Sequence, residues 1–549
     1  MEHGNKMTNT TLRHLRFTVI AVLSVVSAIS NALLANNMRI LDPEPKIIQI
    51  NNAGLHAIVE FSFAWDNSWR TSEAPNNWDA AWVFMKWRRE SEPTAAWSHC
   101  TLAPAIHHII PAGFTTSQPV DNTGIFIYHS SSTSGPVTAT LNNVRLRWDF
   151  SAIGPFEAGE KIEINVFAVE MVYVPEGAFY VGSGGSAYGE LYTYGADPIY
   201  SPYLITSENA ISVSGSTGNL YYNLFLDDTG DQSGPIPDDF PKGYRSFYCM
   251  KYEITQGLYV DFLNCLNRTQ QNARTKADIS STTPLNGFGN TATYINITND
   301  DIPFRRNGIR CDAELHPTDP VIFFCDLNRF NAKNQNDDGH SIANNFMNIS
   351  DLIAILDWMA LRPMTELEYE KACRGPLTPV LNEYAWGNTS IVDLSTLQYQ
   401  GTENESTNDL SNNASWGNLF GGPMRVGSMA GTATDRTGSG ASYYGIMDLT
   451  GNVSERIIGI GRFSGRAYSG RHGDGDLDSD GNANVDFWPS SNIGTGIRGG
   501  GYASNFTCCS GGASPEYLLR TSNRMFASYQ YFDNGRGHET GGRGVRTAP

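Results

Sequence analysis

The chain has 549 residues, with 38 Lys plus Arg against 56 Asp plus Glu, which gives a formal net charge of −18. This acidity argues against a nucleic-acid partner, because phosphate backbones attract basic surfaces. Charged residues are only 17% of the chain, beside 54 Gly, 26 Pro and 11% aromatics, and this balance excludes a coiled coil and a wholly disordered chain.

Residues 1–35 are predicted to be a signal peptide. A basic start that includes Arg13 and Arg16 precedes an apolar run at 17–29, and the small residues of 30–32 follow as a cleavage site. The run is short for a bilayer span, and no later segment reaches about 18 uninterrupted apolar residues. We therefore expect an exported protein, secreted or in the cell envelope, with no membrane span. The alternative is a buried N-terminal helix.

Residues 36–170 are predicted to form a β-sandwich. Short β-rich runs, such as 57–63, 81–87 and 137–146, alternate with Pro, Gly, Asn and Ser clusters at the spacing typical of sandwiches. The tryptophans of this region either fill its core, which we favour, or form a carbohydrate-stacking face. They are Trp65, Trp69, Trp78, Trp82 and Trp87.

A series of ordered motifs runs from residue 171 to the end of the chain. They are MVYVPEGAFYVGSG at 171–184, FYCMKYEITQGLYVDFLN at 247–264, HP at 316–317, LRPMTELEYEKACRG at 361–375, YAWGN at 384–388, YGIMDLTGNVSE at 444–455, IRGGGY at 497–502 and GRGVRTA at 542–548. In this order they resemble the formylglycine-generating enzyme (sulfatase-modifying factor) family over residues 171–549. The resemblance implies a C-type-lectin-like fold with little regular secondary structure, so the whole chain is expected to be α+β.

Two segments of this second part have local signatures. Thr365 and Glu368 have the spacing of a capping box, which predicts a helix that runs to about Cys373. Glu370 and Arg374, four residues apart, are predicted to form a solvated ion pair. A long insertion at about 187–241 is expected to form a surface loop or subdomain.

The segment 448–455 is the best candidate for a metal site. Two carboxylates around a Gly-containing turn offer the hard oxygen ligands that calcium prefers. The family resemblance implies a structural calcium site here, formed by the side chains of Asp448 and Glu455 and the carbonyls of Gly451 and Val453. The alternative is a turn held by hydrogen bonds only.

A second acidic segment resembles the first half of an EF-hand loop. Asp476, Asp478 and Asp480 occupy positions 1, 3 and 5, and glycine follows at position 6. Position 12 is Phe487 instead of the usual glutamate, so the bidentate ligand is missing. Two interpretations remain open: a second calcium site, or a solvated and charge-repelling loop.

The positions of the eight cysteines determine whether the copper site of the resembled family can be present here. Export would permit disulfides, and no pair has the Cys-x-x-Cys spacing of a zinc site. Enzymes of the resembled family hold Cu(I) between two thiolates in a Cys-x4-Cys arrangement after an RGGS-type motif, and use O2 to convert a substrate cysteine to formylglycine. Here the two positions are Ser504 and Cys509. A serine hydroxyl is a poor ligand for soft Cu(I), so we expect the oxidase activity to be absent.

The remaining hypothesis is binding or assembly. Residues 504–539 are rich in Ser, Asn, Gly, Tyr and Phe, which is typical of adaptable recognition loops, although the aromatics could instead fill a core. Domains of the resembled fold also serve as ligand-binding display proteins and as non-catalytic parts of envelope assemblies. We expect a calcium-stabilised protein that binds a protein or glycan ligand, or self-assembles. The alternative is a copper-dependent oxidase in which Cys509 is the catalytic residue.

Overall fold

The structure is a computed structural model. It describes residues 38–224, 228–275, 304–311, 318–330, 332–333, 335–430, 435–504, 515–528 and 535–549. The predicted signal peptide, the HP motif at 316–317 and both Cys508 and Cys509 lie outside the described residues. None of the helices in the described ranges has the length and apolar character that crossing a membrane requires.

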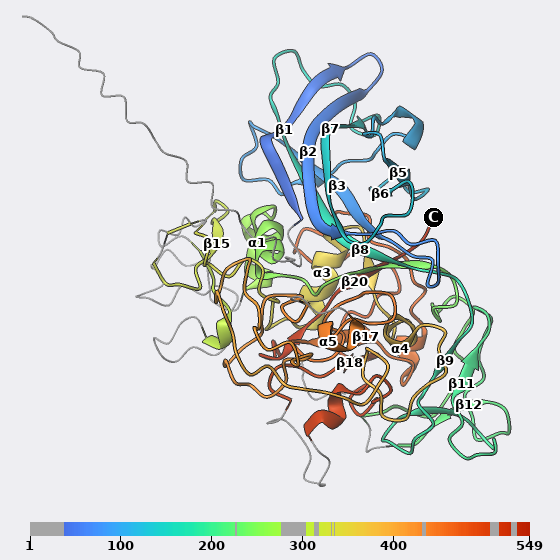
Figure 1. The fold of residues 1–549 in the computed structure, drawn as a ribbon. Coiled ribbons are helices and arrows are strands. Elements are labelled where there is room, and N and C mark those ends of the chain that lie inside the picture. The colour runs from blue at the N-terminus through green and yellow to red at the C-terminus, as the bar shows by residue number, and fades with distance from the viewer. Residues whose placement is uncertain are drawn as a thin grey trace, which may run out of the picture. The chain divides into compact units, whose positions relative to one another are not determined.

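The N-terminal part consists of two packed sheets (Figure 1). An antiparallel sheet has the order β1-β2-β7, with β1 at Arg39–Asn51, β2 at His56–Ser68 and β7 at Val137–Asp149. Its inner side chains share one core with those of β3 (Asp79–Arg89), β6 (Ile125–His129) and β8 (Ile162–Val174). This arrangement confirms the predicted β-sandwich.

Strand β3 is buried on both faces, which explains its nearly unbroken apolar sequence, DAAWVFMKW at 79–87. Successive side chains of a strand point to opposite faces. The odd-numbered residues from 81 to 87 face the three-stranded sheet, and Ala80, Trp82 and Phe84 face the second part of the chain. Trp65, Trp82 and Trp87 are buried, which confirms that they fill the core.

The second sheet continues from the sandwich into the family-like region. It has eight strands in the order β16-β20-β13-β8-β3-β6-β5, and β4 pairs with β3. Strand β8 pairs with β3 on one side and with β13 on the other, so the predicted boundary at 170/171 falls inside a strand that both parts share. The remaining strands are β4 (Ser98–His99), β5 (Phe114–Ser117), β13 (Phe247–Met250), β16 (Arg362–Pro363) and β20 (Gly544–Thr547).

The rest of the second part has short elements joined by long loops, as the resemblance implies. The strand pairs are β9 (Phe179–Val181) with β11 (Tyr203–Ile205), β10 (Leu191–Thr193) with β12 (Leu220–Tyr222), and β14 (Ile309–Cys311) with β15 (Phe323–Cys325). Strand β17 (Ser454–Ile458) lies between β18 (Thr495–Arg498) and β19 (Thr540–Gly541). The helices are α1 (Gln256–Asn264), α2 (Arg268–Arg274), α3 (Ile349–Trp358), α4 (Glu366–Arg374), α5 (Arg436–Ser439) and α6 (Phe463–Arg466), with 3-10 turns at Ala105–His107, Phe304–Arg306 and Pro515–Leu519.

Helix α4 begins at the predicted capping box. Thr365 Oγ1 accepts from the Glu368 amide at 3.1 Å, and the Glu368 carboxylate accepts from the Thr365 amide at 3.0 Å. The prediction of a solvated Glu370–Arg374 pair is wrong, because both side chains are buried, at 0% and 1% exposure. The helix packs against β9 and β17, so charged residues on every face of it meet protein instead of water.

All six described cysteines are buried. Burial raises the pKa of five thiols, those of Cys100, Cys249, Cys265, Cys325 and Cys373. A raised pKa disfavours the thiolate, which is the nucleophile and metal ligand. These cysteines therefore act as small apolar core residues.

Candidate functional site

The end of the IRGGGY motif forms one wall of a cavity of about 150 Å³. Strands β17 and β18 supply Ser454, Ile497 and Arg498, and the following turn supplies Gly500 and Ser504. The cavity is closed by residues from two later segments, namely Leu518, Asn523, Phe526 and 537–540. Four segments, at Ser454, 497–504, 518–526 and 537–540, therefore meet at the position where the resemblance places the first copper ligand.

Ser504 is held in place by its own turn. Its side chain is almost fully buried, and Oγ accepts a hydrogen bond from the Gly501 amide at 2.8 Å. A Cβ on Gly500, where φ is 64°, would lie 2.8 Å from both Ser504 Oγ and Leu519 Cδ2. The glycine is therefore required for this close approach, and the serine hydroxyl serves the turn. Cys509 lies outside the described residues, so the two positions are not compared in space.

Some polar groups at the cavity have hydrogen-bond partners, and one has none among the described residues. The Tyr502 hydroxyl lies 2.9 Å from His538 Nδ1, and burial lowers the pKa of this histidine. Asn523 Oδ1 accepts from the Met525 amide at 3.1 Å, whereas its Nδ2 is buried and has no hydrogen-bond partner among the described residues. A buried donor without an acceptor costs free energy, so Asn523 is a candidate contact for a ligand.

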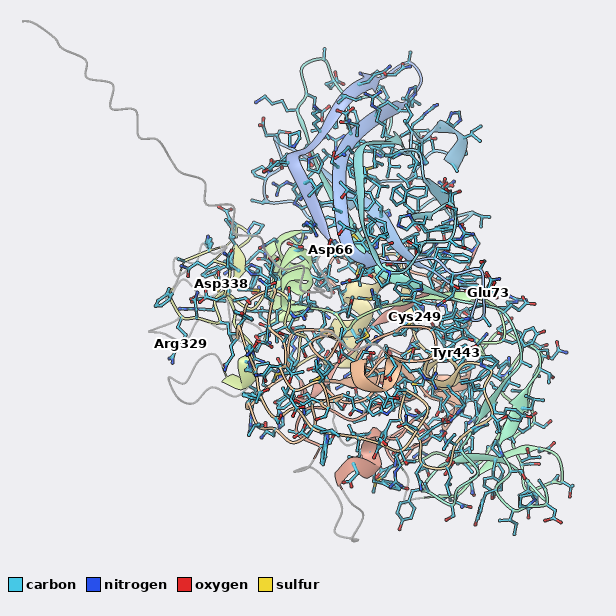
Figure 2. All side chains as sticks on the ribbon, in the orientation of Figure 1. Asp66, Glu73, Cys249, Arg329, Asp338 and Tyr443 are labelled. Atoms are coloured by element: carbon cyan, nitrogen blue, oxygen red, sulfur yellow. The ribbon has the colours of Figure 1, made fainter. Side chains whose placement is uncertain are left out.

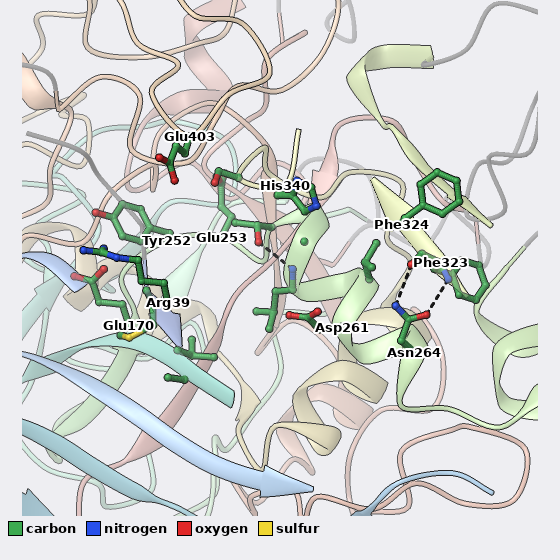
Figure 3. A pocket seen from close by; sticks show the side chains of 18 of the residues that line it. Arg39, Glu170, Tyr252, Glu253, Asp261, Asn264, Phe323, Phe324, His340 and Glu403 are labelled. Atoms are coloured by element: carbon green, nitrogen blue, oxygen red, sulfur yellow. Dashed lines mark hydrogen bonds between the residues drawn. The ribbon is translucent and has the colours of Figure 1, made fainter. Parts of the chain in front are cut away.

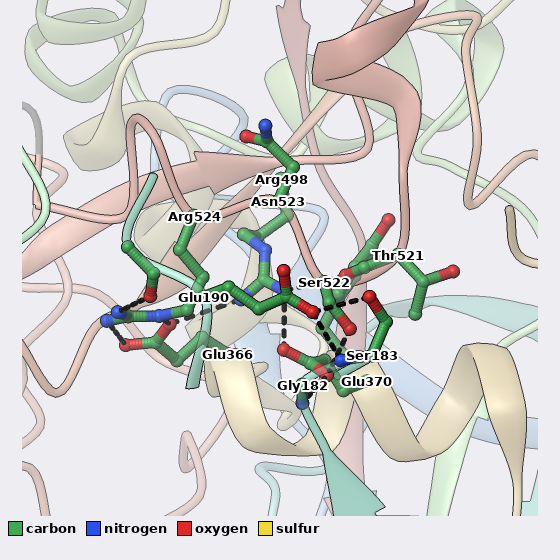
Figure 4. Close-up of polar contacts among 12 residues, drawn as sticks. Gly182, Ser183, Glu190, Glu366, Glu370, Arg498, Thr521, Ser522, Asn523 and Arg524 are labelled. Atoms are coloured by element: carbon green, nitrogen blue, oxygen red, sulfur yellow. Dashed lines mark hydrogen bonds and ion pairs between the residues drawn. The ribbon is translucent and has the colours of Figure 1, made fainter. Parts of the chain in front are cut away.

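A buried charge network supports this cavity from the side of α4 (Figure 4). Arg498 Nη1 lies 3.1 Å from Glu366, and Nη2 lies 2.9 Å from Glu370, with all three side chains at 0% exposure. Burial alone would raise the pKa of Glu370, but the Arg498 and Arg374 guanidinium groups hold it below its ordinary value. Arg524 pairs with Glu366 from the segment that carries Asn523. The network therefore fixes β18 and residues 521–524 on α4.

The two carboxylates of the predicted calcium segment, those of Asp448 and Glu455, lie in a buried cluster. Asp448 accepts from the Gly427 amide at 2.6 Å, and Glu455 Oε1 lies 2.5 Å from Arg543 Nε. Glu253 joins them, because its charge interacts with those of Asp448 and Glu455. Burial raises the pKa of all three carboxyl groups. The second oxygen of Glu455 is buried and has no hydrogen-bond partner in the described ranges.

This cluster fits a cation only with the help of backbone oxygens. Within the part of the chain that the structure describes, no three His, Cys, Asp or Glu side chains are arranged to hold a metal ion. Asp448 and Glu455 would therefore have to be joined by carbonyls, the role implied for Gly451 and Val453. Surplus buried negative charge and the unpartnered oxygen of Glu455 are consistent with such a set.

The EF-hand-like loop is organised by hydrogen bonds. Asp476 accepts from the His99 amide at 2.9 Å, and Asp478 Oδ1 accepts from the amides of Asp480 and Asn482. Lys86 also donates to the carbonyl of Gly475. The loop is thus attached to the N-terminal part, and calcium binding by Asp476, Asp478 and Asp480 stays a prediction.

Two residues of the calcium cluster had no predicted role. Glu253 accepts from Asn452 Nδ2 at 2.6 Å and from the Val453 amide at 3.0 Å, so it orders the turn that carries the expected ligands. Arg543 neutralises Glu455. Both lie inside motifs recognised in the sequence, FYCMKYEITQ and GRGVRTA, but their partners are about 200 and 88 residues away along the chain, so only the fold identifies them.

A family model described as the sulfatase-modifying factor enzyme 1-like domain matches residues 166–509. Among curated proteins, none matches the chain. The matched range begins inside β8 and contains the IRGGGY turn, Ser504 and the whole 448–455 segment.

Proposed function

Because the chain belongs to the sulfatase-modifying factor enzyme 1-like family, we propose that it is an exported member whose site at Ser504 no longer oxidises cysteine and instead binds a protein ligand. The proposal rests on the chemistry and the hydrogen bond of the Ser504 hydroxyl. Its hydroxyl is neutral and hard, and it accepts the Gly501 amide proton where the family chemistry needs a thiolate. Copper held by Cys509 alone would lack its second sulfur.

The cavity beside Ser504 supports ligand binding. Sites for small molecules usually have volumes of about 300–1,000 Å³. The volume here is about 150 Å³, which suits one side chain of a protein ligand better than a free small molecule. Ile497 and Phe526 offer apolar contact, and Asn523 Nδ2 offers a donor for a carbonyl of the ligand. Glycan binding and self-assembly are the competing forms of this proposal.

We also propose that a structural calcium ion binds the segment 448–455. Asp448 and Glu455 would supply carboxylate oxygens, with the carbonyls of Gly451 and Val453 completing the set. The support is the unpartnered buried oxygen of Glu455 within a cluster that has three carboxylates around Arg543. The ion would lower the repulsion among these carboxylates and stiffen the turn that leads into β17.

The proposal is tested by Cu(I) titration against a competing chelator. Wild type, Cys509→Ser, Ser504→Cys and the double variant Ser504→Cys/Cys509→Ser would be compared. We expect no tight binding by wild type, a gain in Ser504→Cys, and loss of that gain in the double variant. Tight binding by wild type that vanishes in Cys509→Ser, together with turnover of a cysteine peptide under O2, would establish the oxidase and overturn the proposal.

A further inference from the structure

Three buried charged side chains lie on one face of the eight-stranded sheet, across three neighbouring strands. They are Asp79 of β3, Glu170 of β8 and Lys251, which directly follows β13. Glu170 lies opposite Ala81, two residues along β3 from Asp79, and its carbonyl accepts from the Lys251 amide at 3.0 Å. Alternate residues of a strand share a face, and so do residues opposite each other, so the three side chains point to the same side. Cys249, on the strand that leads to Lys251, marks their place in the molecule (Figure 2).

The Lys251 ammonium and the Glu170 carboxyl group are in direct contact and are shielded from water. Nζ lies 2.6 Å from Oε1, and the two side chains are 6% and 1% exposed. The ammonium also lies 4.7 Å from the ring centroid of Trp69 and 5.3 Å from that of Tyr252. Reacting atoms about 3–3.5 Å apart are typical of a near-attack geometry, and this contact brings Nζ close to that separation from Cδ of Glu170.

Asp79 supplies a second carboxyl group, which is fixed by three donors. Oδ1 accepts from Ser68 Oγ at 2.8 Å and from the Trp69 amide at 3.0 Å. Oδ2 accepts from Trp65 Nε1 at 3.0 Å. Burial raises the pKa of Asp79, and the charge of Lys251 and these donors oppose the rise. The donors therefore favour the ionised form of Asp79.

The carboxyl groups of Glu170 and Asp79 also interact with each other. Two ionised carboxylates would repel and could only accept hydrogen bonds, so this contact is favourable when one of them carries a proton. Because Asp79 already accepts three hydrogen bonds, the proton is assigned to Glu170, whose Oε2 has no hydrogen-bond partner among the described residues. Burial raises the pKa of Glu170, Lys251 opposes the rise, and the charge of Asp79 adds to it. A protonated carboxyl group is the form that an amine can attack.

We propose that Lys251 and Glu170 form an isopeptide bond, an amide between Nζ and Cδ, with Asp79 as the proton acceptor. One ammonium proton passes to Oε1 while the proton on Oε2 passes to Asp79, which leaves a neutral amine beside a neutral carboxyl group. Nζ then bonds to Cδ, and one oxygen of that carboxyl group leaves as water, with its own proton and a second proton from the nitrogen. Asp79 ends protonated, so atoms and charge balance and no oxidant or other co-reactant is needed.

The surroundings of the triad suit this reaction. Burial alone would lower the pKa of Lys251, but the charges of its acidic neighbours hold it above its ordinary value, so the amine is released only by proton transfer within the pair. A low dielectric favours the neutral partners over the charged ones. Glu170 lines a cavity of about 530 Å³ between β8 and α1, which gives the leaving water an exit (Figure 3). The bond joins residues 81 apart along the chain and closes the loop that contains the insertion, independently of any ligand at Ser504.

The test is mass spectrometry of the purified full chain, intact and after unfolding and digestion. We expect wild type to be lighter than its calculated mass by one water, and one fragment to join the peptides that contain Glu170 and Lys251. Lys161 and Glu90 are the internal control, because their Nζ and Oε2 lie 3.0 Å apart but their side chains are 74% and 54% exposed. They should stay unlinked, since water stabilises the charged pair.

Two variants separate the roles in the triad. Lys251→Arg keeps a cation beside Glu170, but a guanidinium stays protonated and does not attack a carboxyl group, so this chain should have its full calculated mass. Asp79→Asn removes the proton acceptor and should leave at least tenfold less of the crosslinked species. Equal crosslinking in Asp79→Asn would overturn the role of Asp79.

The wild-type masses decide the proposal by themselves, so a variant that fails to fold does not affect the decision. Wild type at its full calculated mass would overturn the isopeptide bond. A lost water that maps to residues other than Glu170 and Lys251 would overturn it as well.

Discussion

Arg543 and Glu455 form a fully buried ion pair, in which Nε of the arginine lies 2.5 Å from Oε1 of the glutamate. Arg543 also donates to the carbonyl of Lys251 at 3.1 Å, so it connects the end of the chain to the segment after β13. Burial raises the pKa of Glu455, and Arg543 opposes this shift. One carboxylate oxygen is thus used by the fold, and the other is buried without a hydrogen-bond partner among the described residues.

The first prediction concerns calcium. In wild type, a chelator should lower the melting temperature, because an ion that binds only the native state stabilises it. Glu455→Gln should abolish this dependence and also destabilise the protein by about 3–5 kcal/mol, since it leaves Arg543 as an unpaired buried charge. Differential scanning calorimetry with and without calcium measures both effects.

Glu366→Gln is the matched control for this experiment. Glu366 is equally buried and pairs with Arg498 and Arg524, but it lies outside the 448–455 segment. Its loss should cost similar stability and leave the calcium shift intact. A wild-type melt that is identical in calcium and in chelator would rule out the calcium site.

The second prediction concerns cooperativity between the two parts of the chain. Trp82 of β3 is fully buried, and its Nε1 donates to the Met359 carbonyl at 2.8 Å, across to the C-terminal part. Trp82→Ala should lower stability by about 3–5 kcal/mol. Trp65→Ala is the comparison, because Trp65 is buried inside the sandwich core.

Both variants should lower one shared unfolding transition, because β8 joins the two parts in one sheet. Calorimetry decides the question. Two resolved transitions in wild type, with Trp65→Ala shifting only one of them, would show that the sandwich unfolds by itself and would contradict this prediction.

The third prediction concerns the cap of α4. Thr365 Oγ1 accepts from the Glu368 amide and also donates to the Pro241 carbonyl at 2.9 Å. Thr365→Ala should reduce the free energy of unfolding in urea by about 1–2 kcal/mol, whereas Thr365→Ser keeps the hydroxyl and should cost much less. Equal losses in the two variants would assign the effect to the lost methyl contacts instead of the cap.

The fourth prediction concerns pH. Burial lowers the pKa of Lys86 to about 8, although the charge of Asp476 opposes the shift. Between this value and the ordinary lysine pKa of about 10.4, the unfolded chain holds a proton that the native protein has released. The free energy of unfolding should therefore rise with pH in this window, because the cost of burying the ammonium is fully present below pH 8 and is lost above it.

Lys86→Met isolates this contribution from other titrating groups. The free energy of unfolding of wild type should rise by about 2–3 kcal/mol more than that of Lys86→Met between pH 7.5 and pH 10, a value of the order expected for a shift of this size. The variant therefore loses stability relative to wild type as the pH rises. Denaturation curves at several pH values measure it. A difference between the two proteins that does not change with pH would mean that Lys86 titrates normally.

The sequence by itself determined the features whose partners are close along the chain. The cap of α4 needs groups three residues apart, and the nearly unbroken apolar run of β3 records burial on both faces. The ordered motifs from 171 onward identified the family, and the match over residues 166–509 confirms it. The turn before Ser504 follows from its glycines.

Only the tertiary structure decided the roles of groups whose partners are distant along the chain. Glu370 and Arg374 have the spacing of a surface pair, but Arg498 and the neighbouring strands enclose them. Glu253 orders a turn 200 residues away. The spacing of charges within one helix does not predict which face of the helix is buried, because burial depends on elements that pack against it from distant parts of the sequence.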